Sequence, residues 1–119
     1  MTTRVILANA FSLSMLTSTP ATILVKELSL EEVQGLLAEG FESAIGHEST
    51  AFFLSKLLGV EVKADRRQIA IDANTILVVF QLLSRLPEGR VLTEEEIASV
   101  KYKFYLVSLE QCSSPPQRG

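Results

Sequence analysis

The chain has almost none of the residues that build disulfide scaffolds and metal centres. Its 119 residues include one cysteine, Cys112, and one histidine, His47. A single cysteine cannot close an intramolecular disulfide or a Cys-x-x-Cys metal site, which excludes a secreted disulfide scaffold and fits a reducing compartment. The fold must therefore rest on apolar burial, and 47% hydrophobic residues in one domain of this size suffice for a core.

An excess of basic charge is also missing. Eleven Lys and Arg against 14 Asp and Glu give a formal net charge of −3 and a pI near 5.2. A sequence-independent DNA or RNA coat protein needs surplus positive charge to displace counterions, so we expect no duplex DNA partner. Any anionic ligand must be bound by a local group, for which residues 61–90, with a slight basic balance, are a candidate rim.

Long apolar runs are absent as well. Residues 5–25 carry no charge, but Asn9, Pro20 and several serines and threonines interrupt them. A membrane-spanning helix needs about 20 predominantly apolar residues, and the same polarity argues against a cleaved signal peptide. The next uncharged stretch, residues 73–84, is too short to span a bilayer. We therefore expect a cytoplasmic protein that does not cross a membrane.

What is present is a series of short strands with helices between them. Apolar and β-branched runs predict strands over residues 4–8, 22–28, 68–71, 75–83 and 101–109. The uncharged strand 75–83 is expected at the centre of the sheet. One helical turn is expected within residues 12–16.

Two helices are predicted with clear boundaries. Ser29 and Glu32 form a capping box that begins one helix, which Gly40 closes. The second covers residues 47–58, buries Phe52 and Phe53 along its apolar face and ends at Gly59. A further capping box, residues 93–96, is expected to open a short helix that reaches residue 100.

This order of elements predicts the fold class α/β, with α+β possible, as a small mixed β-sheet with helices packed on it. One domain should cover residues 1–112, followed by a disordered tail over residues 113–119.

The lone histidine lies where chemistry is plausible. A helix N-terminus has unpaired N–H groups and the positive end of the helix dipole, so His47, Ser49 and Thr50 frame an anion site. A bound phosphate would favour the imidazolium, which suits a general acid that becomes charged with substrate. The plainer interpretation is that His47 only occupies a surface turn.

Several other chemistries lack their motifs. Ala51 stands where the zinc-protease helix pattern requires a second histidine, and no cysteine or aspartate cluster compensates, so no metal is expected. No G-x-S-x-G elbow occurs. The six glycines are spread singly, without a phosphate-binding loop. The sequence therefore predicts no cofactor.

Two further polar groups could act on a phosphate. Gln81, Arg85 and Glu88 surround the end of the apolar strand. Arg85 could donate two hydrogen bonds to a phosphate, and Glu88 could accept a hydroxyl proton or simply pair with Arg85. Asn9 and Ser12 follow the first strand, where turn chemistry alone would also explain them.

Three motifs in this order resemble the viral anti-CRISPR ring nucleases. They are Leu7-Ala8-Asn9-Ala10-Phe11-Ser12-Leu13-Ser14-Met15-Leu16, then Ala44-Ile45-Gly46-His47-Glu48-Ser49-Thr50, and then residues 81–96 with Arg85-Leu86, Glu88-Gly89 and Leu92-Thr93. The resemblance covers residues 5–109. That family includes small proteins of archaeal viruses and bacteriophages, and related host proteins beside type III CRISPR systems.

The resemblance implies a homodimer that binds cyclic tetra-adenylate and cleaves it without metal, leaving linear di-adenylate with 2′,3′-cyclic phosphate ends. Such cleavage switches off type III CRISPR signalling, in the host cytoplasm if the gene is viral. The implied catalytic residues are His47 as general acid, Arg85 as stabiliser of the phosphorane charge, and Glu88 as base or as a holder of Arg85. The implied ring-binding residues are Asn9, Ser12, Ser49, Thr50, Gln81 and either or both of Arg66 and Arg67.

Two alternatives fit the same residues. Every group named could bind a phosphate as well as cleave beside it, so the chain could be a module that sequesters a cyclic oligonucleotide. A small regulatory DNA-binding protein is the third hypothesis, and the acidic charge weighs against it.

Overall fold

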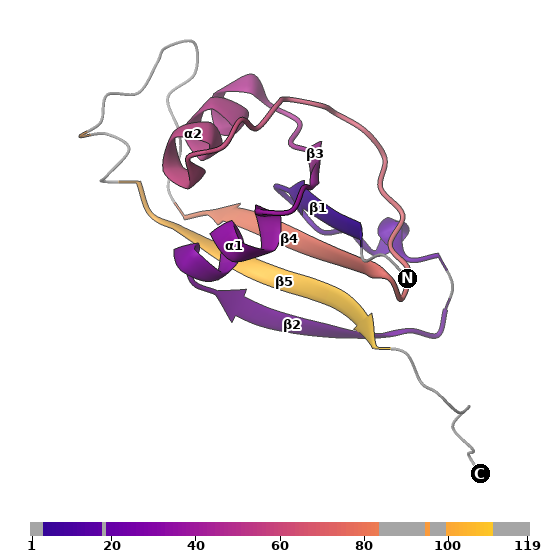
Figure 1. Cartoon of the computed structure of the whole chain (residues 1–119). Helices are drawn as coiled ribbons and strands as arrows, with labels where there is room; N and C mark the ends of the chain where they lie inside the picture. Colours follow the sequence, from indigo (N-terminus) through magenta and orange to yellow (C-terminus); the bar gives the residue numbers. More distant parts are fainter. Residues whose placement is uncertain (1–3, 18, 84–94, 96–99, 111–119) are drawn as a thin grey trace.

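A computed structural model describes residues 4–17, 19–83, 95 and 100–110 (Figure 1). These residues form five strands, two α-helices and one 3-10 turn. In chain order they are β1 (Arg4–Ala8), η1 (Leu13–Met15), β2 (Thr22–Leu28), α1 (Leu30–Leu37), β3 (Glu42–Ala44), α2 (Glu48–Leu58), β4 (Thr75–Leu82) and β5 (Tyr102–Glu110).

The five strands form one mixed sheet in the order β2-β5-β4-β1-β3. β1 runs parallel to both β3 and β4, whereas β5 is antiparallel to β4 and to β2. The predicted mixed sheet with helices is thus confirmed, and β4 is its central strand as expected. The three residues of β3 were not predicted, because a strand this short shows no alternation of its own.

The parallel strands end at a common edge of the sheet. Ala8, the last residue of β1, pairs with Ala44 at the end of β3 and with Val79 near the end of β4. In α/β sheets, ligands bind in the crevice outside the carboxyl ends of such strands. Residues that follow these three ends are therefore the first place to look for a site.

Both α-helices cover the same face of the sheet (Figure 1). Phe53 of α2 is fully buried, and its ring centroid lies 5.7 Å from that of Phe80 on β4. Contacts of this kind between aromatic rings add to the free energy gained from apolar burial. The buried cluster on this face contains Leu7, Leu28, Val33, Leu37, Ile45, Ala51, Phe53, Leu54, Leu58, Val62, Val78, Phe80 and Phe104.

The opposite face, which we call the helix-free face, has a second apolar cluster. Period-two alternation sends Leu77 and Val79 to this side while their neighbours in β4 point to the helices. Two segments outside the strands cover this face. One is η1, which carries Met15, and the other is the stretch before β4, which carries Ile71. Ile71 donates its N–H to the Met15 carbonyl at 2.8 Å, which holds the two segments together.

The predicted capping box of α1 and the predicted glycine at the end of α2 are confirmed, whereas α1 ends at Leu37, with Ala38 as its C-cap, before the predicted Gly40. Ser29 Oγ accepts the Glu32 N–H at 3.1 Å, and Glu32 Oε1 accepts the Ser29 N–H at 2.8 Å. That backbone donor lowers the pKa of Glu32. Gly59 ends α2 with φ at 75°, a left-handed conformation that glycine adopts without a Cβ clash.

Four further predictions need correction or fall outside the described residues. Residues 68–71 form no strand; only Ile71 makes an isolated bridge, with Leu16, because no strand lies beside the remainder. Phe52 is 36% exposed rather than buried with Phe53, since successive helix residues rotate by about 100°. The predicted helix start at residues 93–96, apart from the helical Glu95, and the tail at 113–119 lie outside the described residues.

Among the described residues, no helix has the length and apolar character that crossing a bilayer requires.

Candidate functional site

The residues that follow the parallel strands gather several predicted site residues at one edge. Asn9 comes directly after β1 and is half-buried, while Gly46 and His47 follow the end of β3 after one intervening residue, Ile45. Gln81 is the penultimate residue of β4 and is exposed. Strand register thus brings residues 9, 47 and 81, which lie 34 to 72 positions apart in the sequence, to the same edge of the sheet.

His47 is the N-cap residue of α2, with extended backbone dihedrals of −132° and 137°. The first bond of the helix ladder is donated by Ala51 to the His47 carbonyl at 3.0 Å, so the amides of the residues between them have no helical acceptor. The His47 side chain is exposed and makes no capping bond. This helix end is therefore left open to an anion, in contrast to the fully capped α1.

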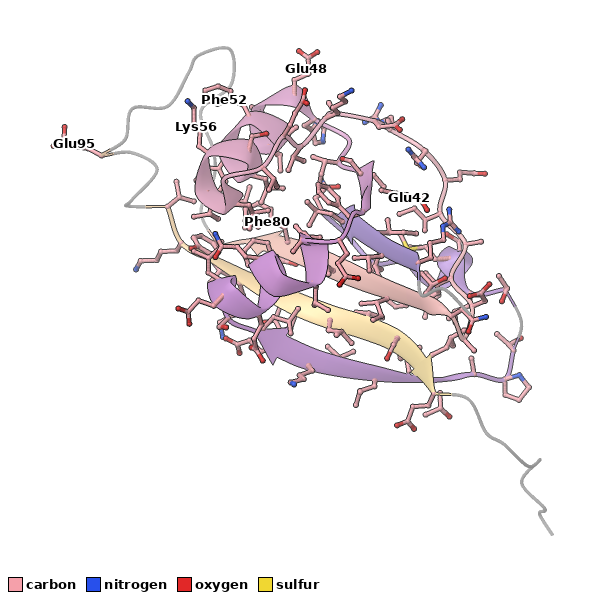
Figure 2. All side chains as sticks on the ribbon, viewed as in Figure 1. Glu42, Glu48, Phe52, Lys56, Phe80 and Glu95 are labelled. Atoms are coloured by element: carbon pink, nitrogen blue, oxygen red, sulfur yellow. The ribbon has the colours of Figure 1, made fainter. Side chains whose placement is uncertain are left out.

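The first turn of α2 presents side chains of different accessibility. Ser49 is half-buried, whereas Thr50 is only 6% exposed and belongs to the side of α2 that packs inward. Glu48 is exposed, and Figure 2 shows its carboxylate pointing away from the sheet. Ser49 is consequently the more accessible of the two hydroxyls predicted to bind a ligand here.

The structure distinguishes the adjacent arginines, which the sequence left as alternatives. A Cβ placed on Gly46 would lie 3.7 Å from Arg66 Nε, so the Arg66 guanidinium is beside the residue that precedes His47. Within the described part of the chain, Arg66 has no hydrogen-bond or ion-pair partner. Arg67 instead pairs with Asp65 and Glu42. Arg66 is therefore the arginine available to an anion at this edge.

Backbone contacts place Arg66 there. Ala64 forms an isolated parallel bridge with Ile45, and Asp65 donates its N–H to the Ile45 carbonyl at 2.8 Å. The Ser43 hydroxyl, on β3, donates to the Lys63 carbonyl. Residues 63–65, which precede Arg66, are thus attached to β3 and to Ile45, the residue that follows it.

Glu42 at the start of β3 connects this segment to β1. Its carboxylate accepts from Arg4 at 2.8 Å and from Arg67 at 3.1 Å. The hydrogen bond from Arg4, aided by the charge of Arg67, lowers the pKa of Glu42, so the carboxylate stays charged in weak acid.

A basic residue that the sequence did not suggest lies beside Gln81. Lys103 on β5 is the direct pairing partner of Gln81, so their side chains leave the same, helix-free face of the sheet. Lys103 Nζ is 3.6 Å from Glu27 Oε1 in an exposed ion pair. Only strand register, which cannot be read from the sequence, reveals this neighbour of Gln81.

Other predicted site residues are not brought to this edge or cannot be placed. Ser12 is the N-cap of η1, where its hydroxyl accepts the Ser14 N–H at 3.2 Å. η1 leads to the contact with Ile71, at the amino end of β4 and thus away from His47. Arg85 and Glu88 follow β4 in the chain and lie outside the described residues.

Within residues 4–17, 19–83, 95 and 100–110, no three His, Cys, Asp or Glu side chains form a group that could hold a metal ion.

Comparison with protein families gives one match over most of the chain, to the family described as STIV B116-like, at residues 5–104. Among solved structures, B116 of Sulfolobus turreted icosahedral virus is similar with a TM-score of 0.78 and 31% sequence identity. That comparison covers 88% of this chain and 98% of the viral one. The shared fold therefore extends over the sheet and the candidate site.

Curated relatives come from both a bacterium and viruses, and their names state no function. Protein YddF of Bacillus subtilis is 32% identical over 102 residues, which cover 83% of this chain and 94% of that protein. Protein 26 of Sulfolobus islandicus filamentous virus is 42% identical over 83 residues, or 68% and 70% of the two chains. Both are called uncharacterized.

Proposed function

Because the chain belongs to the STIV B116-like family and its open helix end meets a free arginine at one sheet edge, we propose that it is a metal-independent ring nuclease. Its substrate is cyclic tetra-adenylate. The observation that carries the proposal is the position of His47, exposed and without a capping bond, next to Gly46 and Arg66. The motif resemblance to viral anti-CRISPR ring nucleases supplies the identity of the substrate.

Electrostatics favour an anion at this position. The N-terminus of α2 carries about half a positive charge, and the Arg66 guanidinium adds a full one nearby. The two positive groups repel each other in the unliganded protein. A phosphate bound between them is attracted to both, which favours binding. Glu48, the acidic residue in this first turn, is exposed and points away, so it offsets the charge only in part.

The proposed reaction is an internal transesterification of the RNA ring. The 2′-oxygen of one nucleotide attacks the adjacent phosphorus in line, and the bond from phosphorus to the 5′-oxygen breaks. The proton lost by the 2′-hydroxyl goes to a base, for which Glu88 is proposed, and His47 gives a proton to the departing 5′-oxygen. Arg85 and Arg66 stabilise the charge on the phosphorane.

Asn9 and Gln81 lie at the same edge and would hold the ring beside His47. Gln81 faces the helix-free side, whereas α2 covers the opposite side, so a ring bound at this edge contacts both layers. A twofold homodimer would place one His47 beside each of two opposite phosphates, giving two linear di-adenylates from one ring. Through this reaction the protein would switch off type III CRISPR signalling.

Incubation with cyclic tetra-adenylate in excess chelator tests the proposal directly. We expect linear di-adenylate with 2′,3′-cyclic phosphate ends, identified by chromatography and mass. Tight binding without product would show a sequestering protein instead. Neither binding nor cleavage would refute both, whereas duplex DNA binding with a steep salt dependence would favour the regulatory alternative.

A further inference from the structure

Arg66 reaches the candidate site from the long connection between α2 and β4, and the residues on either side of it are bonded to other parts of the chain. Asp65 is fixed by its N–H bond to the Ile45 carbonyl at 2.8 Å, at the carboxyl end of β3. The next residue, Arg66, lies against Gly46. Arg67 then directs its guanidinium back to Glu42, at the opposite end of the same strand. The two adjacent arginines therefore have different neighbours, Gly46 for Arg66 and Glu42 for Arg67.

The Arg67 guanidinium is bound to two carboxylates. Its Nε donates to Asp65 Oδ2 at 3.0 Å, a second N–H donates to the same oxygen, and Nη1 donates to Glu42 Oε1 at 3.1 Å. Glu42 is itself oriented by Arg4. A phosphate would have to compete with both carboxylates for Arg67, and it would approach their negative charges.

We propose that Arg67 is a positioning residue, which holds this segment in place through Asp65 and Glu42 and so presents Arg66 to the anion site. The inference rests on the proposed function, because it assigns the direct contact with the ring to Arg66 and not to Arg67. Asp65 and Arg67 are bonded to each other across the intervening residue, so they share one side of the chain and Arg66 occupies the other. The Asp65–Arg67 ion pair therefore restricts the direction in which the Arg66 side chain points.

Each ion pair here is partly exposed and would contribute little to stability alone. Their effect on Arg66 is geometric, because a planar guanidinium with two acceptors has few permitted orientations. A lysine cannot reproduce the three directed donors. We therefore expect Arg67→Lys to restore only part of what Arg67→Ala loses.

A double-mutant cycle distinguishes positioning from direct contact. Binding of cyclic tetra-adenylate is measured by calorimetry on His47→Ala protein, so that the ring stays intact. We expect Arg66→Ala to weaken binding by about 10- to 100-fold, the range for a charged hydrogen-bonding contact. Arg67→Ala should weaken it by about 3- to 10-fold, but by less than about twofold when Arg66 is already alanine. Lys26→Gln, which removes an exposed basic side chain on β2 at the opposite edge of the sheet from β3, is the matched control and should leave affinity unchanged.

Hydrogen exchange of the unliganded protein supplies a readout independent of the ring. The Asp65 amide should exchange faster in Arg67→Ala than in the wild type or in Lys26→Gln. Losses for Arg66→Ala and Arg67→Ala that simply add would overturn the inference by showing direct contact. Unchanged affinity and exchange in Arg67→Ala would overturn it as well. If the His47→Ala parent binds no ring at all, the proposed function fails, and hydrogen exchange still shows whether Arg67 holds this segment in place.

Discussion

Replacing His47 with asparagine should make the protein more stable and much less active. His47 occupies the N-cap position of α2 but offers no side-chain bond to the first turn. Asparagine is among the best N-cap residues, because its side-chain oxygen accepts an N–H of that turn. The exposed imidazole has no partner among the described residues, so its removal leaves no buried group unsatisfied.

The two effects differ in sign and in size. A good N-cap in place of a poor one should add about 0.5 to 1 kcal/mol to the free energy of unfolding. For a domain of this size, that gain corresponds to a melting temperature higher by about 2 to 6 °C. Loss of the general acid should slow cleavage by about 10²- to 10⁴-fold. Selection for a histidine here would then favour catalysis over helix stability.

The assay pairs urea unfolding with single-turnover cleavage of cyclic tetra-adenylate. Two variants serve as controls. His47→Ala should lose activity without the gain in stability, and Ser29→Ala should lose about 1 kcal/mol through the cap of α1 while cleaving at the wild-type rate. Wild-type cleavage by His47→Asn would refute the role of His47 as acid. A parallel fall in its stability and rate would show that the helix end is structural.

Three further predictions concern assembly, acid stability and the core. Mixing His47→Ala with wild-type protein should yield heterodimers that release a singly cut linear tetra-adenylate; its absence, or full activity of a monomer in light scattering, would contradict a shared site. Because the pKa of Glu42 is lowered in the folded state, its contribution to stability is present above pH 4.5 and is lost as the pH falls below that value. Unfolding of Glu42→Gln should therefore depend less on pH in that acidic range, and equal slopes would count against the ion pair. Phe53→Ala should lower the free energy of unfolding by about 3 to 5 kcal/mol, measured in urea, and a loss under 1 kcal/mol would mean that Phe53 is not in the core.

The sequence predicted those features that short segments determine by themselves. The capping box at Ser29 and the glycine that ends α2 both act within one helical turn, so their residues suffice to locate the boundary. Features that depend on a distant partner were missed. β3 is recognisable only because β1 lies beside it, and residues 68–71 have strand-like composition but no neighbouring strand.

The same distinction between local and distant determinants applies to the candidate site. His47 could be singled out from the sequence, since it is the lone histidine and precedes a helix with clear periodicity. The choice between Arg66 and Arg67 could not be made, because the two are adjacent and chemically identical. The carboxylate that distinguishes them, Glu42, is 25 positions away from Arg67 and reaches it only because the segment before Arg66 is attached to β3.

The placement of charge explains how an acidic chain can bind a ring with four phosphates. The net charge of −3 describes the whole chain, yet the electric field at a ligand depends on the nearest groups. Arg66 and the N-terminus of α2 lie together at one edge, while Asp65 and Glu42 are occupied by Arg67 and directed away from it. A twofold dimer would present this local positive group twice to one ring. If so, adding salt should weaken ring binding only modestly, since few counterions are released, and a steep salt dependence would instead require basic groups beyond Arg66 and Arg85.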